Sequence, residues 1–260
     1  MNLFAMIKAI IKLILPKKYH PFNYAAERAI NFLGFRVNNG PFKGMQYIDE
    51  AFVGFVCHKV IGTYEKEIKH IIEHELKNNY DAIFDLGSAE GYYAVGMAKF
   101  GNSRKVVSFE GSEQGRKLQQ RLAKLNGVAD KIEIHGYCKK EQLKEHLKEY
   151  EKVFIICDVD GFELALLDNN HVPGLNAATM LIECHNHCFA AMEKTLIDRF
   201  SSTHDHESFS VRECVDYNDY PCPNLYYRLL PKKYKDFPIK ETERAAEDTW
   251  LYLKPKSKST

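Results

Sequence analysis

Short apolar runs alternate with helical patterns over residues 63–183 of this 260-residue chain, and this alternation constrains the fold more than any other feature. The apolar runs occupy residues 82–85, 105–110, 131–135, 153–158 and 180–183. The helical patterns occupy residues 63–78, 92–100, 114–126 and 140–149. Strands of this length that are separated by helices predict a parallel sheet with helices on both faces.

Two later runs, 208–212 and 249–253, have the pattern of a terminal hairpin pair and bring the predicted sheet to seven strands. We therefore expect an α/β fold with a doubly wound, mostly parallel, Rossmann-like sheet. The helix at 63–78 is expected to begin at Thr63, a good N-cap that is followed by acidic residues in the first turn.

The distribution of proline and glycine suggests where the domain begins and ends. Residues 1–60 are interrupted by both residue types and form a predicted N-terminal extension, a helix followed by an irregular segment. Residues 61–255 contain all of the predicted strands and form the main domain. Residues 256–260 are polar, and we expect them to be a disordered tail.

The charge balance argues against a polyanionic partner. The chain has 36 Lys and Arg residues against 35 Asp and Glu residues, so it lacks the basic excess that nucleic-acid-binding surfaces usually carry. We expect no nucleic acid and instead a small partner molecule. The seven cysteines have irregular spacing, which favours reduced thiols in the cytoplasm over a disulfide framework.

The first 15 residues are very apolar, with Lys8 and Lys12 one helical turn apart. This stretch is too short to span a bilayer, which takes about 20 apolar residues, and no signal-peptide cleavage site follows it. A helix packed on the main domain, or one forming a homodimer contact, is the usual role of a wide apolar stripe. The alternative is a helix lying on a membrane surface, which would add peripheral membrane association to the cytoplasmic location.

The ends of three predicted strands carry acids or glycines. Asp85 and Gly87 begin a glycine-containing loop that ends at Gly91, while Glu110 and Asp158 end two other strands. Ligands bind beyond the carboxyl ends of the strands in an open parallel sheet, and an acid in the position of Glu110 can accept hydrogen bonds from ribose hydroxyls. We therefore expect the three acids to converge on one nucleoside-binding hollow.

These residues resemble a known family. The order Asp85-x-Gly87-x-Ala89-x-Gly91, then residues 107–110, then Asp158 resembles class I S-adenosylmethionine-dependent methyltransferases. More narrowly, residues 156–163 and 180–185 resemble stretches of the FkbM-type methyltransferases, and the similarity covers about residues 60–215. The resemblance implies S-adenosylmethionine as the cofactor.

The resemblance also implies a set of cofactor contacts. Asp85, Gly87 and Gly91 would surround the methionine part, Glu110 the ribose, and Asp158 the sulfonium or amino group. The full set of implied contacts is Tyr64, Glu65, Asp85, Gly87, Ser88, Ala89, Glu90, Gly91, Glu110, Gly111, Gly136, Tyr137 and Asp158, with Gly136 and Tyr137 near the adenine. The chain departs from the family at Ala89, which replaces a glycine, and at Asp160, which replaces a glutamate.

Methyl transfer to a hydroxyl benefits from a general base, and Asp158 and His185 are our candidates for the catalytic residues. A packed or surface imidazole is the alternative interpretation of His185. The family suggests O-methylation of a small-molecule or sugar acceptor. Two other functions remain open: an NAD-dependent enzyme, although residues 87–91 do not match the required Gly-x-Gly-x-x-Gly, and a non-catalytic cofactor-binding module.

Residues 183–188 concentrate groups that can bind metals. Zinc is disfavoured because no paired Cys-x-x-Cys occurs. Asp158, Glu183 and His185 could instead hold magnesium or manganese. Three ligands from two strand ends demand a special geometry, so we favour local hydrogen bonding and predict no metal.

Overall fold

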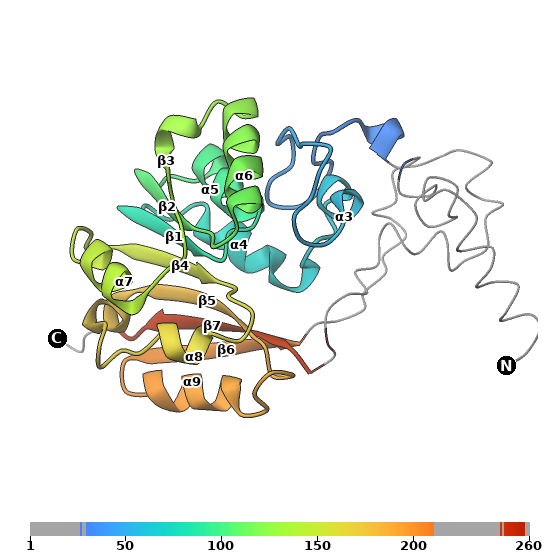
Figure 1. The fold of residues 1–260 in the computed structure, drawn as a ribbon. Coiled ribbons are helices and arrows are strands. Elements are labelled where there is room, and N and C mark those ends of the chain that lie inside the picture. Colours follow the sequence, from blue (N-terminus) through green and yellow to red (C-terminus); the bar gives the residue numbers. More distant parts are fainter. Residues whose placement is uncertain (1–26, 28–29, 211–244, 246, 258–260) are drawn as a thin grey trace, which may run out of the picture.

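The computed structural model describes residue 27, residues 30–210, residue 245 and residues 247–257. A seven-stranded sheet forms their centre, with the strand order β3-β2-β1-β4-β5-β7-β6 (Figure 1). The strands are β1 (Ala82–Leu86), β2 (Lys105–Phe109), β3 (Ile132–His135), β4 (Val153–Cys157), β5 (Thr179–Cys184), β6 (His204–Ser210) and β7 (Thr249–Pro255).

The pairing of these strands confirms the predicted fold. β1 to β5 are parallel, whereas β7 runs antiparallel to both β5 and β6. The predicted hairpin pair is present as β6 and β7, although residues 211–212 lie outside the described residues. The order reverses beside β1, which pairs with β2 on one side and β4 on the other, and such switch points are where doubly wound sheets bind ligands.

Helices cover both faces of the sheet. Figure 1 shows α4, α5 and α6 on one face, and α7, α8 and α9 on the other. The helices are α3 (Val56–Ile61), α4 (Lys69–Glu75), α5 (Tyr92–Phe100), α6 (Glu113–Leu125), α7 (Lys140–Leu147), α8 (Glu163–Leu166) and α9 (Met192–Phe200), with 3-10 turns at Lys66–Ile68, Ala129–Lys131 and Pro173–Ala177.

Side chains of the strands alternate between two apolar cores. In β1, Ile83 belongs to the core beneath α5 and α6, whereas Phe84 and Leu86 belong to the core beneath α7 and α9. Successive side chains of a strand point to opposite faces. Asp85 therefore shares the α5 face with Ile83, which places this acid beneath the loop that leads into α5.

The segment before residue 61 is part of the first core. Phe42, Met45 and Tyr47 are buried in the same cluster as Tyr92 of α5. Gly96 of α5 has no side chain where the Phe42 ring packs, because a Cβ there would lie 2.5 Å from that ring. The second half of the predicted extension thus packs directly against the sheet domain.

One local prediction is wrong. The predicted helix at 63–78 starts only at Lys69, after a 3-10 turn, because Glu65 adopts a left-handed conformation with φ +46° and accepts a hydrogen bond from Tyr93 of α5. At the start of the predicted tail, Lys256 donates from its backbone NH to the Thr203 carbonyl at 2.9 Å and from Nζ to the Ser201 carbonyl at 2.8 Å. The disordered tail itself stays a prediction.

Some predictions concern residues that the structure does not describe. The apolar stretch at 1–15 is one of them, and residues 258–260 of the predicted tail are another. Within the described ranges, no helix has both the length and the apolar character needed to cross a membrane. The cysteines of these ranges carry free thiols at positions 57, 138, 157, 184 and 188.

Candidate cofactor and active site

A cavity of about 520 Å³ opens at the carboxyl ends of β1, β2 and β4. Asp85, Glu110 and Asp158 all line it, so the three strand-end acids converge as the sequence analysis expected. Ten of the predicted site residues line the cavity: Tyr64, Asp85, Gly87, Ser88, Ala89, Glu90, Glu110, Gly111, Tyr137 and Asp158. Glu65, Gly91, Gly136 and His185 are not among the lining residues. The cofactor-binding and catalytic roles of all fourteen residues stay predictions.

Gly87 joins the glycine loop to the end of β4. Its φ is +85°, and a Cβ at this position would lie only 1.6 Å from the carbonyl oxygen of Asp158. The Asp158 backbone NH also donates to the carbonyl oxygen of Leu86 at 2.9 Å. Only glycine tolerates both this backbone conformation and this close approach, so Gly87 lets the loop and the third acid share one cavity.

Asp85 has an unusual environment for a carboxyl group. It is 3% exposed, and its Oδ2 has no hydrogen-bond partner among the described residues. Burial raises the pKa of Asp85 to about 7; the Ala94 backbone opposes this rise, and the charge of Glu110 adds to it. A buried polar atom without a partner is costly, so this carboxyl group is suited to receive a cationic or hydrogen-bond-donating ligand group.

Glu110 is held in place by backbone NH groups. Its Oε2 accepts from Ala89 at 2.8 Å and its Oε1 accepts from Ser112 at 2.6 Å. Gly115 of α6 packs closely against it, because a Cβ there would lie 2.8 Å from the Glu110 Cγ. Each carboxylate oxygen can accept more than one hydrogen bond, so a fixed Glu110 keeps acceptor capacity for a pair of hydroxyls.

Glu90 is bound by the protein itself. It is fully buried, forms an ion pair with Lys59, and accepts from the Tyr47 hydroxyl at 2.7 Å and the Phe52 NH at 3.1 Å. Burial would raise the pKa of Glu90, but the charge and hydrogen bond of Lys59 outweigh it and hold that pKa below its usual range. Glu90 therefore ties the loop to residues 47–59, and its predicted cofactor contact stays a prediction.

A buried polar network beneath the loop was not predicted. Gln119 of α6 donates to Ser108 Oγ at 2.6 Å, and the hydroxyls of Ser108 and Ser88 are 2.7 Å apart. Gly91 makes room for Gln119, because a Cβ at Gly91 would lie 2.6 Å from the Gln119 Cγ. Gln119 gave no sequence signal because it lies among polar residues in an amphipathic helix.

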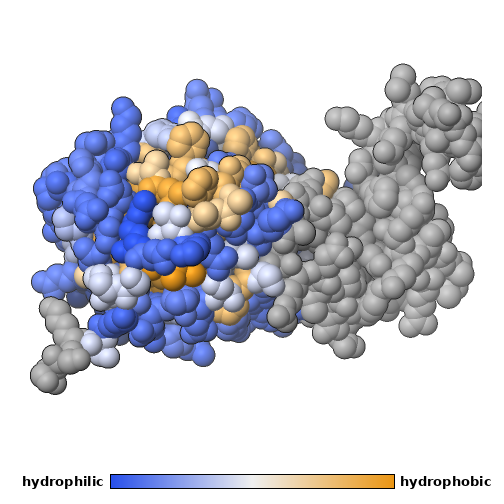
Figure 2. Space-filling model, turned by 90° about the horizontal axis from the view of Figure 1, so that it is seen from below, coloured by the Kyte–Doolittle hydropathy of each residue, from blue (hydrophilic) through white to orange (hydrophobic). Residues whose placement is uncertain are grey.

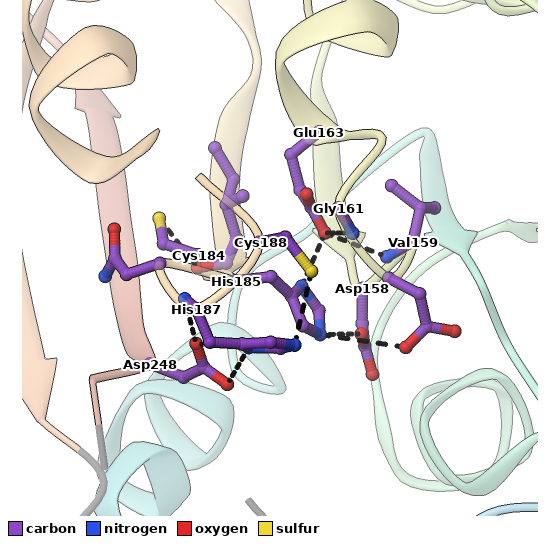
Figure 3. Close-up of polar contacts among 12 residues, drawn as sticks. Asp158, Val159, Gly161, Glu163, Cys184, His185, His187, Cys188 and Asp248 are labelled. Atoms are coloured by element: carbon purple, nitrogen blue, oxygen red, sulfur yellow. Dashed lines mark hydrogen bonds and ion pairs between the residues drawn. The ribbon is translucent and has the colours of Figure 1, made fainter. Parts of the chain in front are cut away.

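His185 lies just beyond β5 and faces Asp158 (Figure 3). Its Nδ1 is 2.7 Å from Oε1 of Glu163, and its Nε2 is 3.6 Å from Oδ1 of Asp158 and 3.7 Å from Oδ1 of Asp160. Burial would lower the pKa of His185, but the Glu163 hydrogen bond and the charges of Glu183, Glu163 and Asp160 raise it above its usual value. The imidazole is thus buried, oriented and next to the cavity.

Glu163 is a site residue that the sequence analysis missed. It is fully buried, and its Oε1 also accepts from the backbone NH groups of Val159 at 3.3 Å and Gly161 at 3.2 Å. These bonds fix the turn that follows β4 as well as the His185 ring. The available signal was its place in the FkbM-like stretch 156–163, where a second acid follows Asp158.

Asp158, Glu183 and His185 also meet a geometric condition for a metal site. One ligand atom from each lies within 4.8 Å of the others. The Glu163 carboxylate on the other nitrogen of His185 is the outer partner that metal-bound histidines commonly have. This set fits a divalent cation, and the expectation that no metal is bound stays a prediction.

Apolar side chains surround the mouth of the cavity. Phe52, Val53, Tyr137 and Phe162 line the cavity and are each between 41% and 57% exposed. The rings of Tyr137 and Phe162 stand edge to face with their centroids 6.4 Å apart. Figure 2 shows apolar surface gathered on one face of the molecule within a polar surround.

Comparison with known proteins gives structural likeness only. No protein-family model matches this chain, and no curated protein resembles it in sequence. Among solved structures, an O-methyltransferase from Bacillus cereus in complex with SAH is 12% identical, with 97% of each chain covered and a TM-score of 0.45. An O-methyltransferase from Thermotoga maritima is 16% identical, with 76% of this chain and 68% of that chain covered and a TM-score of 0.46.

A third similar structure is a precorrin-6y C5,15-methyltransferase from Geobacter metallireducens. It is 13% identical, with 73% of this chain and 88% of that chain covered and a TM-score of 0.48. Identities and TM-scores this low assign no activity to the chain. Its function has to be inferred from the cavity.

Proposed function

We propose that this chain is an S-adenosylmethionine-dependent methyltransferase, FkbM-like in kind, that methylates a hydroxyl of a small-molecule or glycan-like acceptor. The observation that carries the proposal is that Asp85, Glu110 and Asp158 line one cavity, and that the buried Asp85 carboxyl group keeps one oxygen without a partner among the described residues. The cysteine pattern and the free thiols of the described residues support a cytoplasmic location.

The charge of the cavity distinguishes between two nucleoside cofactors. S-adenosylmethionine carries positive charges on its sulfonium and ammonium groups, whereas NAD carries an anionic pyrophosphate. Three lysines line the cavity: Lys59, which is paired with Glu90, Lys140, which lies 3.5 Å from Asp168, and Lys139. Six acids line it as well. The three strand-end acids in the cavity wall favour the cationic cofactor and oppose the anionic one.

The residues present fit this cofactor. Asp85 would accept from its ammonium group, Glu110 would accept from the ribose hydroxyls, and Tyr137 would lie beside the adenine. The bound cofactor supplies an electrophilic methyl carbon, so the protein needs only to position the acceptor and remove its proton. Asp158 lies at the junction between the cofactor loop and His185. It would contact both the cofactor and the acceptor.

His185 is the proposed general base. With Glu163 on Nδ1, the proton of neutral His185 stays on that nitrogen and the lone pair of Nε2 points toward Asp158 and the cavity. An acceptor hydroxyl near Nε2 would lose its proton to His185 as its oxygen attacks the methyl carbon. Because the pKa of His185 is raised, its base form becomes dominant at a higher pH than in an ordinary histidine.

The apolar mouth suggests what else the acceptor carries. Tyr137 and Phe162 are exposed aromatic rings beside the cavity, which suits an acceptor with an apolar or ring face next to its hydroxyl. A sugar ring or an aromatic ring both meet this requirement.

Titration calorimetry tests the cofactor. We expect one S-adenosylmethionine site per chain and no binding of NAD. Stabilisation by NAD without any response to S-adenosylmethionine would overturn the proposal in favour of an NAD enzyme. Cofactor binding without turnover across a broad acceptor panel would favour a non-catalytic module.

Formation of S-adenosylhomocysteine in the presence of acceptors tests the base. His185→Gln should lower kcat by about 100-fold, the usual scale for loss of a general base, and should leave the affinity for S-adenosylmethionine within about threefold. The same assay with EDTA tests the metal question. We expect no loss; a loss reversed by magnesium or manganese would make Asp158, Glu183 and His185 a metal site.

A further inference from the structure

Cys188 is set apart from the other cysteines that the structure describes. It is exposed, whereas Cys57, Cys138, Cys157 and Cys184 are buried. Its Sγ lies 3.2 Å from Nε2 of His187, within hydrogen-bond reach for sulfur. An exposed thiol with an imidazole at this distance has the first two parts of a base-activated nucleophile.

The third part is Asp248. Nδ1 of His187 lies 2.9 Å from both Oδ1 and Oδ2 of Asp248, and the His187 backbone NH donates to Oδ1 at 3.2 Å. The Asp248 side chain is only 3% exposed. A buried carboxylate on Nδ1 keeps the proton of the neutral ring on that nitrogen, so the lone pair of Nε2 faces the thiol of Cys188.

The surrounding chain holds this arrangement in place (Figure 3). The Cys188 backbone NH donates to the His185 carbonyl at 2.9 Å, which closes a tight turn after β5. Asn186 in that turn donates to the Glu247 carbonyl at 2.9 Å and to the Thr249 hydroxyl at 3.1 Å. The turn with its thiol and imidazole is therefore fastened to the segment that carries Asp248.

Cys188 also lies next to the proposed active site. A Cβ on Gly161 would be 3.3 Å from both Cβ and Sγ of Cys188, so the thiol packs against the turn after β4. Asp160 and Phe162, on either side of Gly161, both line the cavity. The His187 ring lies 5.6 Å from the His185 ring, centroid to centroid. The thiol thus packs against a turn whose flanking residues line the cavity.

We propose that Cys188, His187 and Asp248 form a nucleophilic triad and that Cys188 is a covalent modification site for small disulfides. Nε2 of His187 takes the thiol proton, and the Cys188 sulfur attacks one sulfur of the disulfide. The new bond joins Cys188 to that sulfur, the original S–S bond breaks, and the departing thiolate takes the proton from His187. No part of this inference depends on the proposed methyl transfer.

Alkylation of the full-length native protein tests the triad. Iodoacetamide is added at pH 6.5, where an ordinary thiol is only about 1% ionised, and labelling of the Cys188 peptide is followed by mass spectrometry. We expect it to be at least tenfold faster than labelling of the same peptide in the urea-unfolded chain. Cys157 and Cys184 should stay unlabelled in the native protein, which verifies that it is folded.

Matched variants test whether His187 and Asp248 cause the fast labelling of Cys188. His187→Gln and Asp248→Asn should each slow Cys188 labelling at least tenfold at pH 6.5 and much less at pH 9, whereas His74→Gln, an exposed histidine elsewhere, should not change it. Glutathione disulfide should add one mixed disulfide, at Cys188, which dithiothreitol removes and which Cys188→Ser lacks.

One result would overturn the inference without any variant. If native Cys188 is labelled no faster than in the unfolded chain, and its rate rises with pH like that of an ordinary thiol, His187 does not activate it. Unchanged labelling in a folded His187→Gln variant would overturn the inference as well.

Discussion

Two buried carboxyl groups lie near opposite ends of β1, and their surroundings differ. Glu75, close to the start of the strand, accepts hydrogen bonds from the Tyr80 hydroxyl, the Tyr252 hydroxyl at 2.5 Å and the Asn78 amide at 2.9 Å. Asp85, next to the end of the strand, keeps one oxygen without a partner among the described residues. A satisfied acid fixes structure, whereas an unsatisfied one of equal burial is available to a ligand.

The two acids also have different effects on their neighbours. Burial, together with the Glu75 hydrogen bond, raises the pKa of Tyr80 and of Tyr252 well above the usual range, so both tyrosines remain donors at every physiological pH. At the other end of β1, burial raises the pKa of Asp85 itself, to about 7. The end of the strand therefore carries a carboxyl group that titrates near neutrality.

The largest expected effect comes from Asp85→Asn. The amide has the same shape but cannot pair with a cation, so affinity for S-adenosylmethionine should fall about 100-fold, the scale for loss of a buried charge-assisted hydrogen bond. Calorimetric titration measures the change. Asp168→Asn, at a half-buried surface acid elsewhere, serves as the matched control. Unchanged affinity in Asp85→Asn would show that Asp85 does not bind the ligand and that its role does not differ from that of Glu75 in this respect.

Glu75→Gln should lower stability and leave cofactor binding unchanged, the opposite of Asp85→Asn. The amide nitrogen would face donors, so the variant should lose about 3 kcal/mol of unfolding free energy. Because Glu75 does not line the cavity, the folded variant should bind S-adenosylmethionine as the wild type does. Urea unfolding measures the free energy of unfolding, and calorimetric titration of the same preparation measures the affinity for S-adenosylmethionine. Lost binding with intact stability would contradict the structural role.

The pH dependence follows from Asp85. A cationic ligand requires the ionised carboxylate, so affinity should fall as the pH drops below about 7, by up to tenfold per pH unit. The stability of the ligand-free protein depends on pH in the opposite direction. A carboxyl group whose folded pKa is raised contributes stability that is complete below its unfolded pKa, about 3.9, and is lost as the pH rises through 7.

Ligand-free protein should therefore lose up to a few kcal/mol of unfolding free energy between pH 5 and pH 8 through this one group. Asp85→Asn should flatten both this stability profile and the affinity profile. Urea unfolding across that range, with titrations at the same pH values, checks the two profiles together. A pH response that persists in Asp85→Asn would assign it to another group.

The smallest effect is expected at Ala89. This residue has φ +48°, a conformation that costs a non-glycine residue roughly 1–2 kcal/mol. Ala89→Gly removes that strain but adds entropy to the unfolded chain. Stability should change by less than about 1 kcal/mol, and affinity by less than about threefold. A larger loss of affinity would mean that the methyl group of Ala89 contacts the ligand.

Much of the fold and of the cofactor loop could be predicted because the signals are local. The alternation of apolar runs located β1 to β5 and helix α5, and strand ends with glycines located the cavity. The start of α4 was mispredicted because the burial of Glu65 against Tyr93, 28 residues away, overrides a good N-cap at Thr63. A tertiary contact can override the local helix propensity and determine the backbone conformation.

The second layer of the site could not be predicted. Lys59 pairs with Glu90 across 31 residues, Gln119 reaches Ser88 across the same number, and His187 meets Asp248 across 61. No periodicity encodes which distant polar side chains will face each other. Glu163 beside His185 was the exception with a sequence signal, since it lies in the stretch that resembles the FkbM-type enzymes.

A crystal structure with S-adenosylhomocysteine tests the central claim most directly. We expect the amino group within hydrogen-bond distance of the Asp85 carboxyl group and the ribose hydroxyls on Glu110, with the sulfur toward Asp158 and His185. A nucleoside bound outside this cavity, or one inside it with both acids untouched, would contradict the claim.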